Sequence, residues 1–384
     1  MGTTTKYEYL KAIKPRYKKA TKRQKKLILD EFCHTCNYNR KYAIRLLNSK
    51  PKPKIRTNLS KRGRKKQYDH PMIVNVLWDL WVTTNLPCSK RLKAIIPLWL
   101  PHFNKYILSE QVKQKLQRIS PASIDRLIAP IRIKYNKRGK STTKPGALLK
   151  KRIPIKTNQW DETISGFLEA DTVAHCGNSV AGSFVYTINC VDIATGWTIQ
   201  RAIWEKGEKG VVKAIADMEN NLPFQIKGFD CDNGSEFLNW HLHKYLTNRK
   251  RPIQFTRSRA YHKNDNAHIE GKNWTHIRQY LGYQRFDKPE LVNMLNQLYT
   301  TEWNLYFNCF IPSVKLMEKY REGSKTIKKH DSPKTPLQRL LDSNHIDQTV
   351  KNNLKNQFDQ LNPFQLQKQM KQKIDAIIDL VNKA

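Results

Sequence analysis

The chain has 384 residues, which exceeds one ordinary hydrophobic core, so we expect two or three domains. Its 70 Lys and Arg residues and 32 Asp and Glu residues give a formal net charge of +38. No segment approaches the roughly 20 consecutive apolar residues of a membrane-spanning helix, and the first residues lack the apolar stretch of a signal peptide. These features exclude a membrane partner and predict a soluble, cytoplasmic protein.

The positive charge is concentrated in the first part of the chain. Residues 1–150 contain 37 basic and 7 acidic side chains, whereas residues 151–384 contain 33 and 25. Lys and Arg have affinity for nucleic acid because each phosphate contact releases condensed counterions. We therefore expect the front of the chain to bind nucleic acid. The seven cysteines follow no framework pattern, which predicts reduced thiols.

Residues 22–49 have the spacing of two short helices joined by a turn. Asn37 or Asn39 is suited to cap the second helix, from which Arg40, Lys41 and Arg45 would project. A basic second helix is typical of a helix-turn-helix, whose recognition helix meets DNA, so we interpret residues 1–50 as a DNA-binding arm. The apolar residues expected to share its small core are Leu27, Ile28, Phe32, Ala43, Ile44 and Leu47.

Residues 51–70 form a basic run interrupted by proline, which we interpret as a linker because it cannot bury enough apolar surface to fold. Arg62 and Arg64 are candidates for minor-groove contacts, and a merely solvated charge run is the alternative interpretation. Helical spacing returns over residues 71–133, interpreted as a second helical DNA-binding unit. Ser89 is expected to cap one of its helices, and Ser120 another that begins at Pro121. Residues 134–160 form a second basic linker.

From residue 161 the pattern becomes that of an α/β domain. Two β-branched and aromatic runs, 184–190 and 197–204, are separated by a Thr-Gly turn and predict a β-meander. A helix at 208–220, a strand at 224–230, a helix at 235–248 and a strand at 252–256 follow, and then a long helix at 288–307. We expect an α/β core over 161–310. Residues 311–384 are expected to form a loop and then helices, without distinct chemistry.

Three segments of this core each supply one carboxylate at the end of an element. Asp171 closes the first strand, Asp232 stands at an Asn-Gly turn, and Glu270 lies in a helix after a polar loop. Converging carboxylates repel one another unless a cation is present, and hard divalent ions favour carboxylate oxygen. The segments therefore predict a site for two ions of Mg²⁺ or Mn²⁺, suited to phosphodiester chemistry. Asp192 is a rival first carboxylate, but its Asp-x-Ala-Thr-Gly setting favours a hairpin turn.

The three ordered segments together resemble the DDE transposases and integrases of the retroviral integrase superfamily, especially insertion-sequence transposases with an integrase-type core. The stretch Asp232-Asn-Gly-Ser-Glu236-Phe matches the family's Asp-Asn-Gly-x-Glu-Phe turn without alteration. Residues 258–270 are similar to its Arg-x-Tyr-His-x-x-Asp-Asn-x-x-Val-Glu stretch. The resemblance covers residues 161–310, and the front end also resembles the helix-turn-helix arms of such transposases.

The resemblance implies an RNase H-like catalytic core, two divalent metal ions, and action as a homo-oligomer on element ends and target DNA. It implies a DNA-associated transposase that cleaves and transfers strands, with Asp171, Asp232 and Glu270 as catalytic metal ligands. Lys272 stands where the family often has an Arg, and suits phosphate binding. The residues expected to support the site are Asn233, Gly234, Glu236, His262 and Asn266. For the last two, a DNA contact and a purely structural role remain open.

Two other functions are compatible with the same residues. One is a nuclease of similar fold that only hydrolyses DNA, and the other is a DNA-binding regulator derived from a transposase whose core is silent. The intact set of three acids favours an active enzyme. The run Cys33-His34-Thr35-Cys36 raises the question of zinc, but a closed zinc site needs four ligands and no second pair lies nearby.

Overall fold

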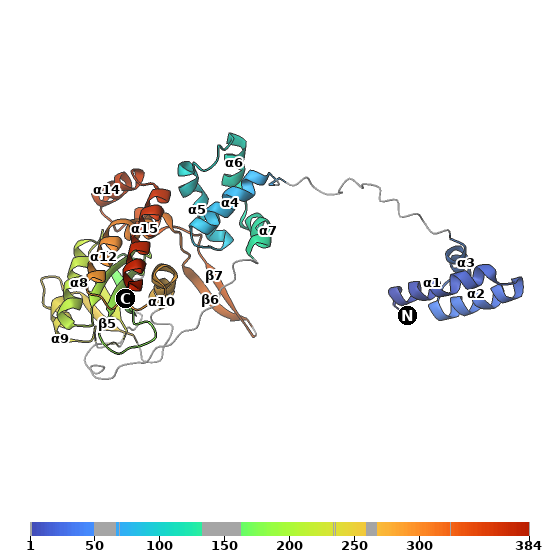
Figure 1. Cartoon of the computed structure of the whole chain (residues 1–384), viewed down its shortest axis with the longest axis horizontal. Coiled ribbons are helices and arrows are strands. Elements are labelled where there is room, and N and C mark those ends of the chain that lie inside the picture. The colour runs from blue at the N-terminus through green and yellow to red at the C-terminus, as the bar shows by residue number, and fades with distance from the viewer. Residues whose placement is uncertain are drawn as a thin grey trace. The chain divides into compact units, whose positions relative to one another are not determined.

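The computed structural model describes residues 2–49, 67–68, 70–132, 163–232, 234, 236–258, 267–322 and 324–383. The chain divides into two compact units, Met1–Lys66 and Gln67–Ala384 (Figure 1). Most of the first predicted linker and all of the second lie outside the described residues. So do five residues of the predicted sites, namely Arg62, Arg64, Asn233, His262 and Asn266.

The first unit contains three helices: α1 (Thr3–Lys19), α2 (Lys22–Cys36) and α3 (Arg40–Asn48). Thr21 and Gln24 form a capping box at the start of α2, which satisfies backbone N–H groups of its first turn. Asn37 ends α2 in the left-handed conformation, and the Asn39 side chain accepts a hydrogen bond from the Lys41 backbone N at 3.0 Å. Two asparagines therefore fix the turn between α2 and α3.

The small core of this unit differs from the expected one at two positions. Leu27 is 65% exposed and Ile44 is 38% exposed. Neighbouring helix positions point about 100° apart, so α2 cannot bury three consecutive residues equally, and Leu29 turns inward instead of Leu27. Helix α1, which the sequence did not predict, completes the core with Ile13 and Tyr17. The residues buried as predicted are Ile28, Phe32, Ala43 and Leu47.

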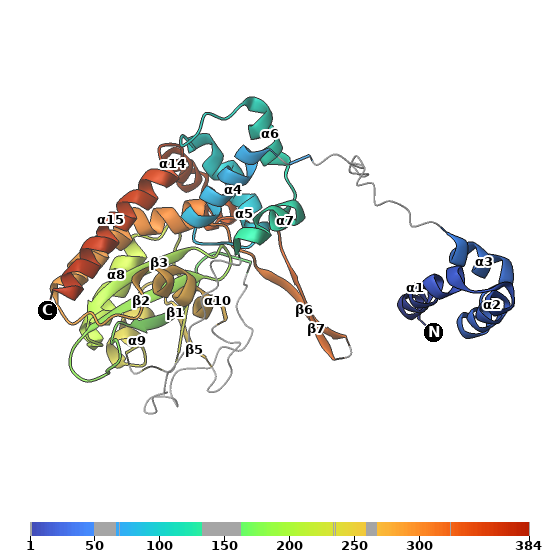
Figure 2. The same cartoon turned by 45° about the vertical axis from the view of Figure 1, so that its right-hand side comes forward.

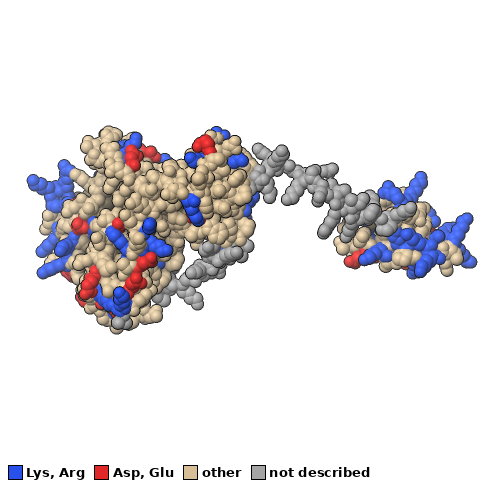
Figure 3. Space-filling view, turned by 45° about the horizontal axis from the view of Figure 1, so that its top comes forward, with Lys and Arg blue, Asp and Glu red and all other residues tan. Residues whose placement is uncertain are grey.

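Basic side chains dominate the surface of the first unit. Residues 2–49 contain 13 Lys and Arg residues and 3 Asp and Glu residues. Figure 3 shows Lys and Arg over much of the face in view, with few acidic side chains among them. The small apolar core thus carries a cationic surface on the face in view.

A five-stranded mixed sheet lies at the centre of the second unit, with the strand order β3-β2-β1-β4-β5 (Figure 2). β1 pairs antiparallel with β2 and parallel with β4, while β2 and β3 form the predicted meander and β5 pairs parallel with β4. The predicted α/β core is therefore a mixed sheet. Its strands are β1 (Phe167–Ala174), β2 (Val185–Asp192), β3 (Thr198–Trp204), β4 (Gly228–Cys231) and β5 (Gln254–Arg257).

Helices cover both faces of this sheet. On one face, α8 (Glu208–Asn220) and α9 (Trp240–Thr247) pack over an apolar layer that includes Leu168, Ile188 and Phe229. Side chains alternate between the faces of a strand, so Glu169 and Asp171 of β1 face the opposite layer. The elements of that layer are α10 (Ala267–Lys272), the π-helical η3 (Asn273–Arg278), α11 (Gln279–Leu281), α12 (Glu290–Leu298) and its π-helical continuations η4 (Tyr299–Trp303) and η5 (Tyr306–Phe310).

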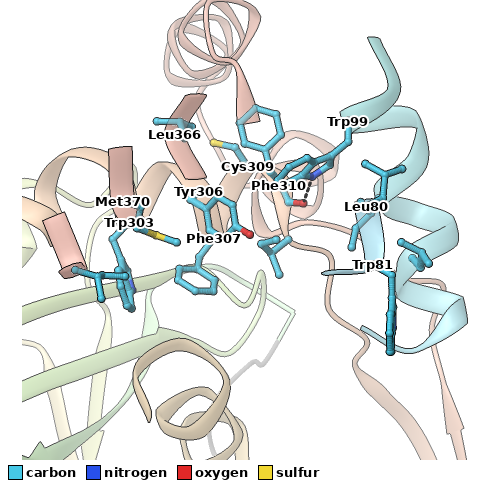
Figure 4. Packing of buried hydrophobic residues seen from close by; sticks show 14 of the residues in the cluster. Leu80, Trp81, Trp99, Trp303, Tyr306, Phe307, Cys309, Phe310, Leu366 and Met370 are labelled. Atoms are coloured by element: carbon cyan, nitrogen blue, oxygen red, sulfur yellow. Dashed lines mark hydrogen bonds between the residues drawn. The ribbon is translucent and has the colours of Figure 1, made fainter. Parts of the chain in front are cut away.

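The helices of residues 71–132, the predicted second helical unit, share one apolar cluster with the core helices and belong to the same compact unit. Figure 4 shows Trp99 against Tyr306 and Phe310, and its indole Nε1–H donates to the Phe310 carbonyl oxygen at 3.2 Å. The Phe364 ring lies edge-on to Trp99, with centroids 4.8 Å apart. The helices concerned are α4 (Pro71–Thr83), α5 (Ser89–Trp99), η1 (Leu100–His102), α6 (Glu110–Arg118) and α7 (Pro121–Arg132).

One of the two predicted serine caps is wrong. Ser89 lies inside α5, where its hydroxyl donates to Asp125 Oδ2 at 2.7 Å, and Cys88 occupies the N-cap position. Ser120 does cap α7, because its Oγ accepts a hydrogen bond from the Ser123 backbone N at 3.2 Å. Ser89 therefore joins α5 to α7 rather than capping a helix end.

The chain after the core begins with an antiparallel hairpin where a loop was expected. It is formed by β6 (Leu316–Glu322) and β7 (Lys325–His330). Three helices follow: α13 (Pro336–Asp342), α14 (Gln348–Asp359) and α15 (Pro363–Asn382). Met370 and Ile377 of α15 belong to the same apolar cluster as α12. Within the described ranges, no helix has the length and apolar character needed to cross a membrane.

Candidate active site

Asp171 lies inside the central strand β1, rather than at the strand end expected from the sequence, on the face that α10 and η3 cover. Its Oδ1 accepts a hydrogen bond from the Thr172 backbone N at 2.7 Å, and its Oδ2 accepts one from Asn273 Nδ2 at 2.6 Å. Burial, reinforced by repulsion from Asp232, raises the pKa of Asp171 to about 7. The structure therefore brings these two predicted carboxylates, each partly buried, close enough to repel each other.

A chain of amide side chains leads to Asp171 across the sheet. Gln200 Nε2 on β3 donates to Asn189 Oδ1 on β2 at 2.9 Å, and Asn189 Nδ2 donates to Asn273 Oδ1 at 2.8 Å. Because the Asn273 oxygen accepts from Asn189, its NH₂ group is turned toward Asp171. Gln200 and Asn189 are fully buried. These hydrogen-bonded amides thus fix one orientation of the Asn273 side chain, and the Asn273 amide favours the ionised form of Asp171.

Asp232 directly follows β4, in a turn built around Gly234. Asp232 Oδ1 accepts a hydrogen bond from the Gly234 backbone N at 3.0 Å. A Cβ atom at position 234 would lie 2.7 Å from Cδ and Oε2 of Glu236 and 2.9 Å from Asp232 Oδ1. A larger residue at position 234 would therefore force the ends of both carboxylate side chains to shift.

Glu236 ties this turn to β1 and to the end of β3. Its Oε1 accepts a hydrogen bond from Thr172 Oγ1 at 2.8 Å and one from Lys206 Nζ at 2.5 Å, and the residue is only 3% exposed. Burial raises the pKa of Asp232 and repulsion from Glu236 adds to this, whereas the Lys206 ammonium acts in the opposite direction. Lys206 thus balances part of the negative charge around Asp232.

Glu169 holds the start of α10 against β1. It lies two residues before Asp171, on the same face of the strand, and is 1% exposed. Its Oε2 accepts hydrogen bonds from the backbone N atoms of His268 at 3.1 Å and Ile269 at 3.3 Å. One strand therefore carries both the first carboxylate and the anchor of the helix that bears Glu270.

Glu270 stands outside the contact between the two aspartates. Its side chain is exposed, and it lies three positions before Asn273, whose amide reaches Asp171. Residues three apart share one face of a helix, so Glu270 is at the edge of the site. Within the residues that the structure describes, no three His, Cys, Asp or Glu side chains form a ready metal-binding group. In donor type the aspartates fit a hard divalent cation, which would also relieve their repulsion.

Lys272 is placed differently from a side chain that meets DNA at the surface. It is partly buried, and its Nζ lies 3.4 Å from Nε2 of His276. Burial, with Arg91 and Arg339 adding repulsion, lowers the pKa of Lys272 to about 7. The predicted phosphate-binding residue therefore lies among other basic groups inside the second unit.

Asp192, the rival first carboxylate, is a turn residue as the sequence favoured. Its Oδ2 accepts hydrogen bonds from Thr195 N at 2.8 Å and Thr195 Oγ1 at 2.6 Å, and its Oδ1 accepts one from Gly166 N at 2.8 Å. Both of its oxygens are occupied by the turn between β2 and β3 and by the start of β1. This leaves Asp171 as the first carboxylate of the candidate site.

Three of the basic residues predicted to meet DNA lie on α3, in three different settings. Arg40 forms an ion pair with Asp30, and the Arg45 guanidinium lies 5.0 Å from the centroid of the Tyr42 ring. Lys41 is exposed.

All seven cysteines are free thiols, and burial raises the pKa of Cys36. In the described part of the first unit, no metal-binding group surrounds Cys36.

Sequence reasoning missed four residues that shape the site: Gln200, Asn189, Asn273 and Lys206. Only Asn273 carried a signal, because it stands one helical turn after Glu270. The other three come from β2, from β3 and from the residues just after β3, and their side chains meet the site only through the pairing of strands.

The chain is 35% identical over 344 residues to the uncharacterized protein y4rM of Sinorhizobium fredii, a match that covers 88% of this chain and 96% of that protein. The chain therefore belongs to the same protein family as y4rM. No family model matches it. Among solved structures, the catalytic core domain of BIV integrase matches with a TM-score of 0.29 and 16% identity, over 47% of this chain and 97% of that one.

Proposed function

We propose that this protein is a transposase that cleaves DNA at element ends and joins the freed end to target DNA, with Asp171, Asp232 and Glu270 as catalytic carboxylates. The observation that carries the proposal is the proximity of Asp171 on β1 to Asp232, which directly follows the neighbouring strand β4. Two partly buried carboxylates that repel each other cost stability and are typical of a functional site. The mixed α/β sheet supports the RNase H-like core that the sequence resemblance implies.

The two aspartates would hold Mg²⁺ or Mn²⁺, and Glu270 would join them from α10 by rotation of its side chain. When bound, such ions supply an activated water or 3′-hydroxyl and stabilise the leaving oxygen of a phosphodiester. The chain's own residues prepare the site. Asn273 orients Asp171 and favours its ionised form, Glu169 fixes the start of α10, and Lys206 balances the charge around Asp232.

The first unit would bind the DNA of the element ends. The 13 basic and 3 acidic residues between positions 2 and 49 give the charge that phosphate contacts require. Helix α3 would enter the major groove with Lys41 exposed, and Arg40 would exchange its ion pair with Asp30 for a phosphate. Cleavage at two ends of one element would then be made by a homo-oligomer, with one catalytic unit at each end.

The proposal is tested by incubating the full-length protein with a labelled duplex that carries its element's end and with a supercoiled target. Parallel reactions contain Mg²⁺, Mn²⁺ or EDTA. The expected result is metal-dependent nicking at the 3′ end, followed by a joined product. Nicking without joining would contradict strand transfer and favour a nuclease. Tight binding without nicking in either metal would contradict an enzyme and favour a DNA-binding regulator.

A further inference from the structure

The hairpin of β6 and β7, called the β-arm below (residues 316–330), projects from the second unit in both views (Figure 1, Figure 2). Of the six residues of β7, only Ile327 is partly buried, and Met317 of β6 is 70% exposed. A lone two-stranded hairpin is marginally stable in water, and its open edges invite aggregation. An arm that covers no core is therefore expected to serve in binding.

The base of the β-arm is firmly attached, so the arm is held in a defined direction. Ser313 and Lys334 exchange two backbone hydrogen bonds, of 2.9 and 3.2 Å. Asp331 Oδ1 accepts from the Lys315 backbone N at 2.6 Å, while its Oδ2 accepts from Arg339 at 2.6 Å. Arg339 also donates to the Ser313 carbonyl oxygen at 3.0 Å. These contacts fasten both strands where they leave the folded body.

The strand register separates the charges of the β-arm onto two faces, because directly paired residues of antiparallel strands share a face. On one face, Glu318 forms an ion pair with Lys329 at 2.8 Å, and the register also pairs Glu322 with Lys325. The acids are thus matched by lysines, and the pair of Tyr320 and Ile327 lies between them.

Among the side chains that the structure describes, the opposite face carries basic residues and no acid. Arg321, which the register pairs with Thr326, and Lys328 lie on this face. Lys328 is exposed. This cationic face is complementary to a polyanion.

We propose that the β-arm binds duplex DNA through this cationic face. A two-stranded β-ribbon fits the major groove, which is about 12 Å wide, and six residues of a strand extend about 20 Å. Lys and Arg on the ribbon would contact the phosphates that border the groove. The proposal rests on the proposed function in one respect, since the DNA is taken to be the DNA that the enzyme cuts.

The test is the double substitution Arg321→Gln/Lys328→Gln in the full-length protein. The matched control, Lys368→Gln/Lys371→Gln, removes two exposed lysines from α15 and changes the net charge equally. Fluorescence anisotropy with a labelled duplex gives the affinity over a range of salt concentrations. Two lost phosphate contacts would lower the slope of log K against log salt by about 1.8, and would weaken binding about tenfold or more at about 0.1 M salt. The control variant is expected to retain the wild-type affinity and the wild-type slope of log K against log salt.

A second measurement addresses contact directly. A photo-crosslinking side chain at Thr326, on the cationic face, is expected to form a protein–DNA adduct, whereas one at Gln369 on α15 is not. Equal affinity and slope in the arm variant and the control, without an adduct from position 326, would overturn the proposal. A changed oligomeric state in the arm variant with unchanged DNA binding would also overturn it and assign the arm to a second copy of the chain. Cleavage measured in parallel separates the two claims. If DNA binding depends on the β-arm but no cleavage occurs, only the proposed transposase function is contradicted. If the protein cleaves DNA but its DNA binding does not depend on the β-arm, only the proposed role of the β-arm is contradicted.

Discussion

Asn273 donates its side-chain amide to Asp171, with Nδ2 2.6 Å from Oδ2. This hydrogen bond joins η3, which continues the helix that carries Glu270, to the strand that carries the first carboxylate. The amide cannot rotate freely, because its oxygen accepts from Asn189 at 2.8 Å. The position of α10 and the ionisation of Asp171 are therefore linked through one side chain.

Removing this amide is predicted to impair the site without unfolding the protein. In Asn273→Ala, Asp171 loses a donor that lowers its pKa, so its pKa should rise above about 7. Loss of a residue that orients a metal ligand typically costs about 10- to 100-fold in activity. The measurement is the metal-dependent cleavage rate as a function of pH, in which the acid limb should move to higher pH. Asn353→Ala on exposed α14 is the control, and an unmoved acid limb in Asn273→Ala would refute the role.

Adding one methyl group at Gly234 is predicted to damage the site sterically. The new Cβ would lie 2.7 Å from the Glu236 carboxylate and 2.9 Å from Asp232 Oδ1, so both side chains must move. We expect Gly234→Ala to lose at least about tenfold in cleavage rate. Gly210→Ala on α8 is the matched control, because its Cβ meets no atom within 4 Å and alanine favours a helix. Equal rates in the two variants would show that the turn tolerates the displacement.

The buried His175 is predicted to make stability depend on pH. Burial, with Arg278 nearby, lowers the pKa of His175 to about 3. The unfolded chain then binds a proton below about pH 6.5 that the folded chain does not, so stability is full above that pH and falls as pH decreases toward 3. From pH 6.5 to pH 5 the loss should be about 2 kcal/mol.

Urea unfolding at several pH values measures this dependence. The variant His175→Gln should lack the loss assigned to His175, whereas His345→Gln, at an exposed position, should retain the wild-type slope. A slope in His175→Gln as steep as that of the wild type would show that other groups cause the dependence.

Trp99 is predicted to be essential for the attachment of α5 to the core. It is fully buried among Tyr306, Phe310 and Phe364, and it donates to the Phe310 carbonyl oxygen. Replacing such a side chain with alanine costs about 3–5 kcal/mol. Trp274→Ala, at a position 44% exposed, should cost much less in the same urea titration. Similar losses in both variants would mean that residues 71–132 do not depend on this contact.

The parts of the fold that the sequence predicted are those whose burial leaves a periodic signal. The meander of β2 and β3 and the turn at Asp192 follow from alternating apolar residues and turn chemistry. Helix α1 was missed because it buries only Ile13 and Tyr17 and contains Pro15. The β-arm was missed for a related reason, since almost all of β7 is exposed and no apolar alternation marks it.

In the candidate site, too, only the features with a local sequence signal could be predicted. The Asp232 turn is a local motif, and its glycine is explained by local contacts. The pairing of Asp171 with Asp232 required the resemblance to a known family as well. The amide chain from Gln200 could not be predicted, because its residues come together only through the register of β1, β2 and β3. The exposed rotamer of Glu270 likewise depends on how α10 docks, which Glu169 determines.

The central claim is that Asp232 is a catalytic carboxylate in an enzyme that cleaves DNA. The most direct measurement compares Asp232→Asn with Asp375→Asn, an exposed site on α15, in metal-dependent cleavage of a labelled element end. Both variants should retain the salt-sensitive DNA binding of the wild type. We predict that Asp232→Asn abolishes cleavage while Asp375→Asn cuts at the wild-type rate. Cleavage by Asp232→Asn at the wild-type rate would contradict the assignment of the site.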